Sequence, residues 1–361
     1  MIIRGSGMAS HFPDFFVVGA PRCGTTSLCR YLAKHPAICF SRPKETHYFT
    51  LLGADWSPRN LEREYLQRFF PHLNSDHRLV GEGSVSYIYS PPAIERIVQL
   101  NPQARMIVLL RNPIDMLPSY HLRMLYVLAE DVEDLATAWA LQDARARGER
   151  VPRTCPDARL LLYREIVRFD AQVERLYQLA GRERCLVLLF DDLAADPLRV
   201  YRQTLDFLGI EYDGRTNFSR KLQSRRYRYR LLQRLLYAPP KPARALLERA
   251  QIRAKHEKRS GRLPLLKRLA RWNTVIGRPL PLTPEFAAQV RQEIAPDVDR
   301  LGLLLGRDLS HWVTGEPSSR KSSERPSDAS PARSATASTS RDHLDGNQAG
   351  ATQSRRTSTT P

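Results

Sequence analysis

Short apolar runs alternate with longer amphipathic segments along most of the chain. Three mostly apolar runs predict buried strands, at residues 15–19, 105–110 and 185–190. A weaker candidate lies at 79–81, and a helical pattern over 25–34 ends before Pro36. Uninterrupted apolar strands separated by amphipathic helices predict an α/β fold, in which a parallel sheet is covered by helices on both faces.

Ligands of such sheets bind at the carboxyl ends of the strands, so we expect the functional residues just after Val18, Leu110 and Phe190. We predict a single domain over residues 15–314, preceded by a lead at 1–14. Residues 315–361 are rich in Ser, Thr and Arg and have few large apolar residues. They therefore predict a disordered tail.

A basic section over residues 217–276 predicts two amphipathic helices, broken at Pro239–Pro242. Its simplest interpretation is helical cover for the sheet, with the basic residues on the wet face. The alternative is a lid, or a contact with an anionic surface such as a membrane.

The composition is globular, with 42% hydrophobic and 26% charged residues. Lys and Arg number 56 against 38 Asp and Glu, a net charge of +18 that favours anionic partners: nucleic acid, anionic lipid, acidic glycan or a phosphate-rich cofactor. Five cysteines without a C-x-x-C pair argue against a disulfide framework or zinc ribbon. We expect a cytoplasmic protein without signal peptide or membrane span, soluble or peripheral at a membrane.

The segment 19–26 after the first strand has the G-x-x-x-x-G spacing of a phosphate-binding loop. Its backbone N–H groups and the following helix N-terminus would converge on an anion. Thr25 stands where nucleoside-triphosphate loops carry Lys, which argues against ATP or GTP chemistry. The loop suits a nucleotide 5′-phosphate, and we expect a side chain at Gly24 to project into the phosphate space. An ordinary tight strand–helix turn is the alternative.

The loop sequence P-R-C-G-T-T-S-L at 21–28 resembles the 5′-phosphosulfate loop of sulfotransferases that use 3′-phosphoadenosine 5′-phosphosulfate (PAPS). That family usually has Lys where this chain has Arg22, which keeps the charge on a planar group. The resemblance implies that one run of the loop binds the donor: Arg22, Cys23, Gly24, Thr25, Thr26 and Ser27.

A second element, R-N-P-I-D-M-L-P-S at 111–119, resembles the family's 3′-phosphate motif. It implies that Arg111 and Ser119 hold that phosphate from two sides. Pro118 departs from the motif and is expected to loosen the helix before Ser119. The basic segment Lys221–Arg226 is a further candidate for the 3′-phosphate.

The segment P-K-E-T-H-Y-F at 43–49 resembles an element of heparan-type glycan sulfotransferases. By this resemblance Glu45 is the general base, Arg22 stabilises the leaving group and His47 is the second candidate base. Glu45 in a surface ion pair with Lys44 or Arg42 is the alternative. At Gly83 the heparan-type enzymes have Lys, so one cation is missing here.

Together these motifs imply a PAPS-dependent sulfotransferase without a metal, acting on a hydroxyl or, less readily, an amine of a glycan, glycolipid or small metabolite. Matches at Phe190–Leu193 and Leu282–Trp312 extend the resemblance over residues 15–312. Two alternatives remain: a nucleotide kinase of related fold, and a basic protein that binds nucleic acid or a membrane through Arg220–Arg234. The first conflicts with Thr25, and the second would need neither motif.

Overall fold

The structure is a computed structural model that describes residues 12–51, 58–219, 224–237 and 263–315. The tail, apart from its first residue, and residues 1–11 of the lead lie outside the described residues. Phe12 is buried in the core, and the carboxylate of Asp14 accepts a hydrogen bond from the backbone N–H of Val80 at 2.7 Å. None of the described helices combines the length and apolar character that crossing a membrane requires.

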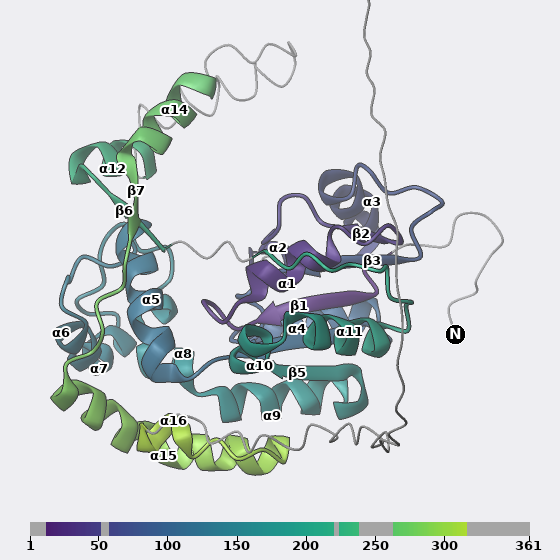
Figure 1. Cartoon of the computed structure of the whole chain (residues 1–361). Helices are drawn as coiled ribbons and strands as arrows, with labels where there is room; N and C mark the ends of the chain where they lie inside the picture. The colour runs from purple at the N-terminus through teal and green to yellow at the C-terminus, as the bar shows by residue number, and fades with distance from the viewer. Residues whose placement is uncertain (1–11, 52–57, 220–223, 238–262, 316–361) are drawn as a thin grey trace, which may run out of the picture. The chain divides into compact units, whose positions relative to one another are not determined.

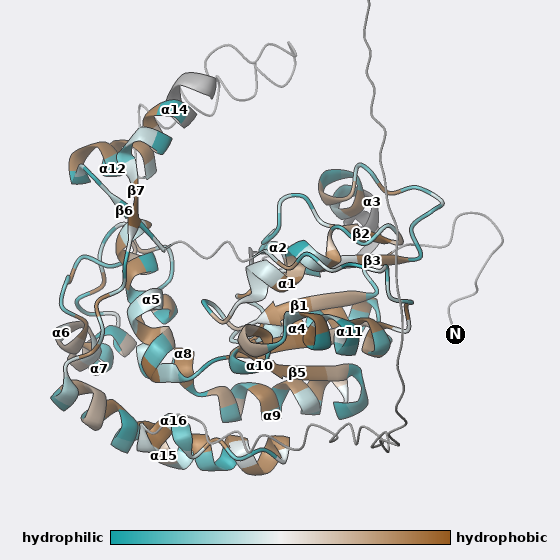
Figure 2. Ribbon diagram, viewed as in Figure 1, coloured by the Kyte–Doolittle hydropathy of each residue, from teal (hydrophilic) through white to brown (hydrophobic). Residues whose placement is uncertain are grey.

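A parallel five-stranded sheet forms the centre, in the order β2-β3-β1-β4-β5. Its strands are β1 (Phe15–Gly19), β2 (Ile38–Phe40), β3 (Leu79–Gly83), β4 (Arg105–Leu110) and β5 (Cys185–Leu189). All five residues of β1 are buried. Because successive side chains of a strand point to opposite faces, both faces are covered; helices lie on both sides in Figure 1, and β1 and β5 are apolar along their length in Figure 2.

The expected α/β fold with a covered parallel sheet is confirmed. The predicted strands at 15–19 and 105–110 have the observed bounds, and 185–190 is one residue too long. The weak candidate at 79–81 is β3, the neighbour of β1. The three-residue strand β2 was missed, since so short a run gives no periodic signal.

The helices of the described chain are α1 (Thr25–Leu32), α2 (Tyr48–Leu51), α3 (Pro58–Phe69), α4 (Pro91–Leu100), α5 (Pro113–Tyr126), α6 (Leu135–Ala140), α7 (Gln142–Ala146), α8 (Tyr163–Val167), α9 (Phe169–Ala180), α10 (Phe190–Ala195), α11 (Pro197–Leu208), α12 (Arg230–Tyr237), α14 (Leu263–Asn273), α15 (Pro284–Leu305) and α16 (His311–Thr314). The side chain of Asn112 caps α5 by accepting from the N–H of Ile114 at 3.0 Å. α5 then continues through Pro118 to Tyr126. The loosening that we expected before Ser119 therefore does not end the helix there.

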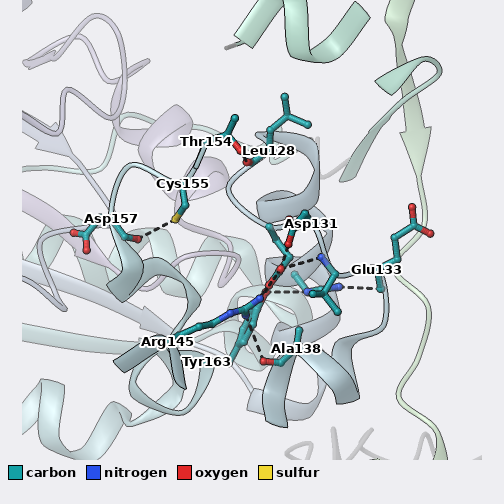
Figure 3. A network of polar contacts seen from close by, with 12 residues as sticks. Leu128, Asp131, Glu133, Ala138, Arg145, Thr154, Cys155, Asp157 and Tyr163 are labelled. Carbon is teal, nitrogen blue, oxygen red and sulfur yellow. Dashed lines mark hydrogen bonds and ion pairs between the residues drawn. The ribbon is translucent and has the colours of Figure 1, made fainter. Parts of the chain in front are cut away.

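A buried ion pair fixes the chain that follows α5 (Figure 3). Arg145 donates to both carboxylate oxygens of Glu130, at 2.7 and 2.8 Å, and neither side chain is exposed. The hydroxyl of Tyr163 donates to Glu130 at 2.8 Å. Since removing one partner of a buried pair costs about 3–5 kcal/mol, this network holds α7 and α8 firmly beside the end of α5.

A second, two-stranded antiparallel sheet pairs β6 (Ser224–Tyr227) with β7 (Thr274–Gly277). We call residues 224–237 and 263–278 the arm: β6 and α12, then α14 and β7. β6 contacts α5, and α12 contacts α14. The basic section therefore contains helices, as predicted, and two strands that its pattern did not predict.

Candidate active site

The predicted phosphate-binding loop joins β1 to α1 at the carboxyl end of the sheet. Gly24 has φ +91°, a conformation that favours glycine. A Cβ atom at Gly24 would lie 2.9 Å from the ring of Phe190 and 3.2 Å from Leu193. The predicted direction of a side chain at Gly24 is therefore wrong. Such a side chain would point toward α10 and not into the phosphate space.

A cavity of about 610 Å³ brings most of the predicted residues together. Its lining includes six of them: Arg22, Gly24, Thr25, Thr26, Glu45 and His47. Four others do not line it: Cys23, Ser27, Arg111 and Ser119. Cys23 and Ser27 are buried within the loop and the start of α1. The roles assigned to all ten stay predictions.

Arg22 connects three parts of the chain. Its Nε donates to Ser119 Oγ at 2.7 Å, and its Nη2 donates to Ser224 Oγ at 2.8 Å. Burial lowers the pKa of Arg22, and the nearby charges of Arg123 and Arg111 lower it further. Ser119 thus contacts the loop arginine directly, while Ser224, at the start of β6, was not predicted, although it lies in the Lys221–Arg226 segment.

Arg111 follows β4 and is half-buried beside the loop. Its guanidinium lies over the ring of Phe190, 4.6 Å from the centroid. Its Nε is buried and has no hydrogen-bond partner among the residues that the structure describes. A buried cationic donor without a partner is costly, so this atom favours an anionic ligand.

Glu45 and His47 lie on the loop that follows β2. The N–H of Glu45 donates to the carbonyl of Gly83 at 2.8 Å, and the N–H of His47 donates to Ser84 Oγ at 3.0 Å. Lys44 Nζ lies 2.7 Å from Glu45 Oε1, and His47 Nε2 lies 3.6 Å from Oε2. Burial raises the pKa of Glu45, but His47 and the charge of Lys44 outweigh it and lower the value to about 2. Glu45 is therefore ionised at neutral pH.

Glu82 supports this loop from below. It is fully buried and accepts hydrogen bonds from Ser84 and Tyr65, both at 2.5 Å, and from Tyr87 at 3.0 Å. Burial raises the pKa of Glu82. Since Ser84 also accepts a hydrogen bond from the N–H of His47, Glu82 has a structural role beneath this loop.

The ring of His47 is fixed on its other side by a chain of hydroxyl groups. Nδ1 lies 2.8 Å from Ser86 Oγ, which lies 2.8 Å from Thr50 Oγ1. This chain points the Nε2 edge toward Glu45. No sequence signal had singled out Ser86 or Thr50 as partners of His47.

The three predicted catalytic residues share a left-handed backbone conformation. Arg22, Glu45 and His47 have φ values of +63°, +65° and +51°. Such values are uncommon for residues other than glycine and cost about 1–3 kcal/mol each. Strain of this kind is concentrated at functional sites, which supports the choice of these residues independently of any motif.

The opposite wall of the cavity is largely apolar and was not predicted. It is lined mainly by Tyr89, Tyr120, Met124, Val127 and Leu160, with Arg123, Asp157 and Arg159 as polar members. Arg159 forms a forked ion pair with Asp157 at 2.7–3.0 Å. These residues come from separate loops and helices that only the tertiary fold brings together. Within the described ranges, no cluster of three His, Cys, Asp or Glu residues could hold a metal ion.

The first strand of the parallel sheet leads into a glycine-containing loop, and Arg22 of this loop lines one cavity together with Glu45. This arrangement at the carboxyl ends of the strands is typical of enzymes that transfer a group from a nucleotide donor. The family profile described as the sulfotransferase domain matches residues 12–226, more than half of the chain. The chain belongs to this family, as the loop motifs predicted.

The chain is similar to curated sulfotransferases and to a solved sulfotransferase structure. The chain is 34% identical over 113 residues to "Membrane-associated sulfotransferase kil1" of Dictyostelium discoideum, covering 30% of this chain and 22% of that protein. It is 27% identical over 206 residues to "Bifunctional heparan sulfate N-deacetylase/N-sulfotransferase 4" of Mus musculus, covering 55% and 22%. The chain thus spans about a fifth of the length of these relatives. A crystal structure of a sulfotransferase from Alicyclobacillus acidocaldarius is similar over 83% of this chain and 98% of that one, with TM-score 0.56 and 26% identity.

Proposed function

We propose that this protein transfers the sulfonyl group of PAPS to an acceptor hydroxyl, with Glu45 as general base. The observation that carries the proposal is that an ionised Glu45 and the anion-binding loop line one cavity. The acceptor oxygen would bond to sulfur as the bond from sulfur to the bridging phosphate oxygen breaks. Glu45 would take the hydroxyl proton, and 3′-phosphoadenosine 5′-phosphate (PAP) would leave.

The residues present fit this donor. Arg22 and the N–H groups of the loop suit the 5′-phosphosulfate, and the unpartnered Nε of Arg111 suits the 3′-phosphate. Ser119 accepts from Arg22, so its own hydroxyl proton remains free to be donated to a phosphate. Thr25, in place of a Walker lysine, argues against the kinase alternative.

Lys44 lowers the basicity of Glu45. A carboxylate with a pKa of about 2 is a weak base while Lys44 Nζ remains 2.7 Å away. If Lys44 turned toward the sulfonyl oxygens when the donor binds, it would stabilise their charge and release Glu45 at the same time. We propose this exchange as the step that activates the base.

The apolar wall of the cavity limits the classes of acceptor that fit the site. Tyr89, Tyr120 and Leu160 favour a hydroxyl carried on an apolar or aromatic body, as in a glycolipid or small metabolite. A polyanionic glycan would need several unpaired cations, and Arg159 is already paired with Asp157. The wall therefore favours a glycolipid or a small metabolite as the acceptor over a polyanionic glycan.

Ligand-dependent melting separates the candidate functions. PAP should raise the melting temperature of the full chain, whereas ATP with Mg²⁺ and an oligonucleotide should have little effect. A screen of alkyl, aryl and glycolipid alcohols with labelled PAPS then identifies the acceptor. Stabilisation by ATP–Mg²⁺ but not by PAP would contradict the proposal.

A further inference from the structure

The arm presents apolar side chains to solvent and buries an amide. On α12, Leu231 and Leu235 are 84% and 55% exposed, whereas Gln233 between them is buried. Gln233 Nε2 donates to the carbonyl of Tyr126 at 2.6 Å, which fixes this side of the helix against α5. A helix that faces water on its outer side normally has the reverse arrangement.

The second half of the arm repeats this inversion. Asn273 is fully buried, and its Nδ2 donates to Gln233 Oε1 at 3.0 Å. The neighbouring Trp272 is half-exposed and stacks on Tyr229, with ring centroids 5.5 Å apart. On β7, Ile276 is 66% exposed. The outer surface of the arm therefore carries leucine, isoleucine and aromatic side chains.

The charge of the arm has a single sign. Residues 224–237 and 263–278 include nine Lys or Arg and no Asp or Glu. Exposed arginines surround the apolar side chains: Arg225, Arg226, Arg228, Arg230, Arg234, Arg268, Arg271 and Arg278. An anionic partner complements such a surface.

We propose that the arm docks on the surface of an anionic lipid bilayer. Arginines would contact the headgroups, Trp272 and Tyr229 would lie at the interface, and Leu231, Leu235 and Ile276 would reach the acyl boundary. A nucleic acid would use the arginines and aromatic rings but would leave the aliphatic side chains in water. A second copy of the chain would bring two all-basic surfaces together in a symmetric contact.

The arm is joined directly to the candidate active site. Ser224, its first residue, accepts a hydrogen bond from Arg22 at 2.8 Å, and Thr274 and Tyr126 hydroxyls lie 2.9 Å apart. Docking would therefore place the cavity close to the membrane surface. A cavity at the membrane surface would have access to an acceptor carried on a lipid. This consequence rests on the proposed function, whereas the docking itself does not.

Vesicle co-sedimentation of the full chain tests the proposal. We expect binding to phosphatidylcholine vesicles that contain phosphatidylglycerol, weaker binding as salt rises, and little binding to phosphatidylcholine alone. The triple variant Leu231→Ser/Leu235→Ser/Ile276→Ser should lose most of the binding. Arg234→Ala and Arg268→Ala should each weaken it about fivefold. Leu303→Ser, which replaces an equally exposed leucine on α15, should bind as the wild type does.

Three results would overturn the proposal: equal binding to neutral and anionic vesicles, full binding by the triple variant, or no vesicle binding. Tight oligonucleotide binding that the triple variant keeps would assign the arm to nucleic acid instead. A wild-type dimer that the triple variant converts to a monomer, measured by light scattering, would assign it to a second copy. Stabilisation by PAP should be unchanged in the triple variant, which separates loss of docking from loss of the donor site.

Discussion

Arg22 Nε donates to Ser119 Oγ at 2.7 Å across 97 residues of sequence. The first residue lies on the loop after β1 and the second lies two turns into α5. The two motifs that we predict to bind the donor are thus joined by one hydrogen bond. Arg111, which follows β4, is close enough to this pair for its charge to lower the pKa of Arg22.

The first prediction concerns Arg111. Arg111→Ala should weaken PAP binding ten- to a hundredfold, since a hydrogen bond to a charged group contributes about 1.5–3 kcal/mol. The measurement is calorimetric titration with PAP and with adenosine 5′-phosphosulfate, which has no 3′-phosphate. An equal loss for both ligands would show that Arg111 acts by packing on Phe190 and not by holding the 3′-phosphate.

The second prediction separates backbone strain from collision at Gly24. Gly24→Ala should be destabilised by about 1–3 kcal/mol beyond the cost of its positive φ, because the new methyl group meets Phe190 at 2.9 Å. Gly148→Ala is the matched control: its φ is +82°, and nothing lies within 4 Å of its Cβ position. Thermal melts should show a larger decrease for Gly24→Ala, and only that variant should lose PAP affinity.

The third prediction uses the lowered pKa of Glu45. A carboxyl with a folded pKa of about 2 stays ionised well below its unfolded pKa of 4.5, so it stabilises the fold fully above the unfolded pKa. That contribution is lost progressively as the pH falls from the unfolded pKa to about 2. Lys44→Met removes the lysine charge beside the carboxylate, so the pKa of Glu45 should rise toward the ordinary 4.5. The acid limb of the pH profile of kcat/KM should move to higher pH as the pKa of Glu45 rises.

The control for this pH profile is Lys34→Met, which removes an exposed lysine just after α1. Its profile should match that of the wild type. If Lys44→Met leaves the acid limb where it was, Glu45 is not the group whose ionisation governs the reaction.

The fourth prediction concerns the strained backbone of the site. At φ +51°, His47→Gly should be more stable than His47→Ala by about 1 kcal/mol, although both remove the imidazole. Denaturant unfolding of the pair isolates the backbone contribution. A more stable His47→Ala would mean that this conformation carries no strain.

Much of this architecture could be predicted from the chain because it is local. Apolar runs bounded by turn residues located β1 and β4 to the residue, and Asn112 with Pro113 located the start of α5. Loop spacing predicted in the same way a connection from strand to helix at 19–26, and this segment joins β1 to α1. Such features depend on neighbours in sequence, which a pattern contains.

What could not be predicted depends on tertiary contacts. Ser224 meets Arg22 across 202 residues, and the apolar wall is assembled from loops and helices far apart in sequence. The direction in which Gly24 packs is decided by Phe190, the first residue of α10, which is far away in the sequence. The sequence pattern of the arm predicts only basic helices, because its strands β6 and β7 are four residues long and lie outside the main sheet.

The most direct test of the account is the turnover of Glu45→Gln, with labelled sulfonyl transfer from PAPS to the acceptor found in the screen. The substitution keeps the size of the side chain but cannot take a proton. PAP affinity should remain, while kcat should fall by about 10²–10⁴, the usual contribution of a positioned base. His47→Gln, compared in parallel, should keep most of its turnover. Full activity in Glu45→Gln, or its loss only in His47→Gln, would contradict the assignment of Glu45 as the base.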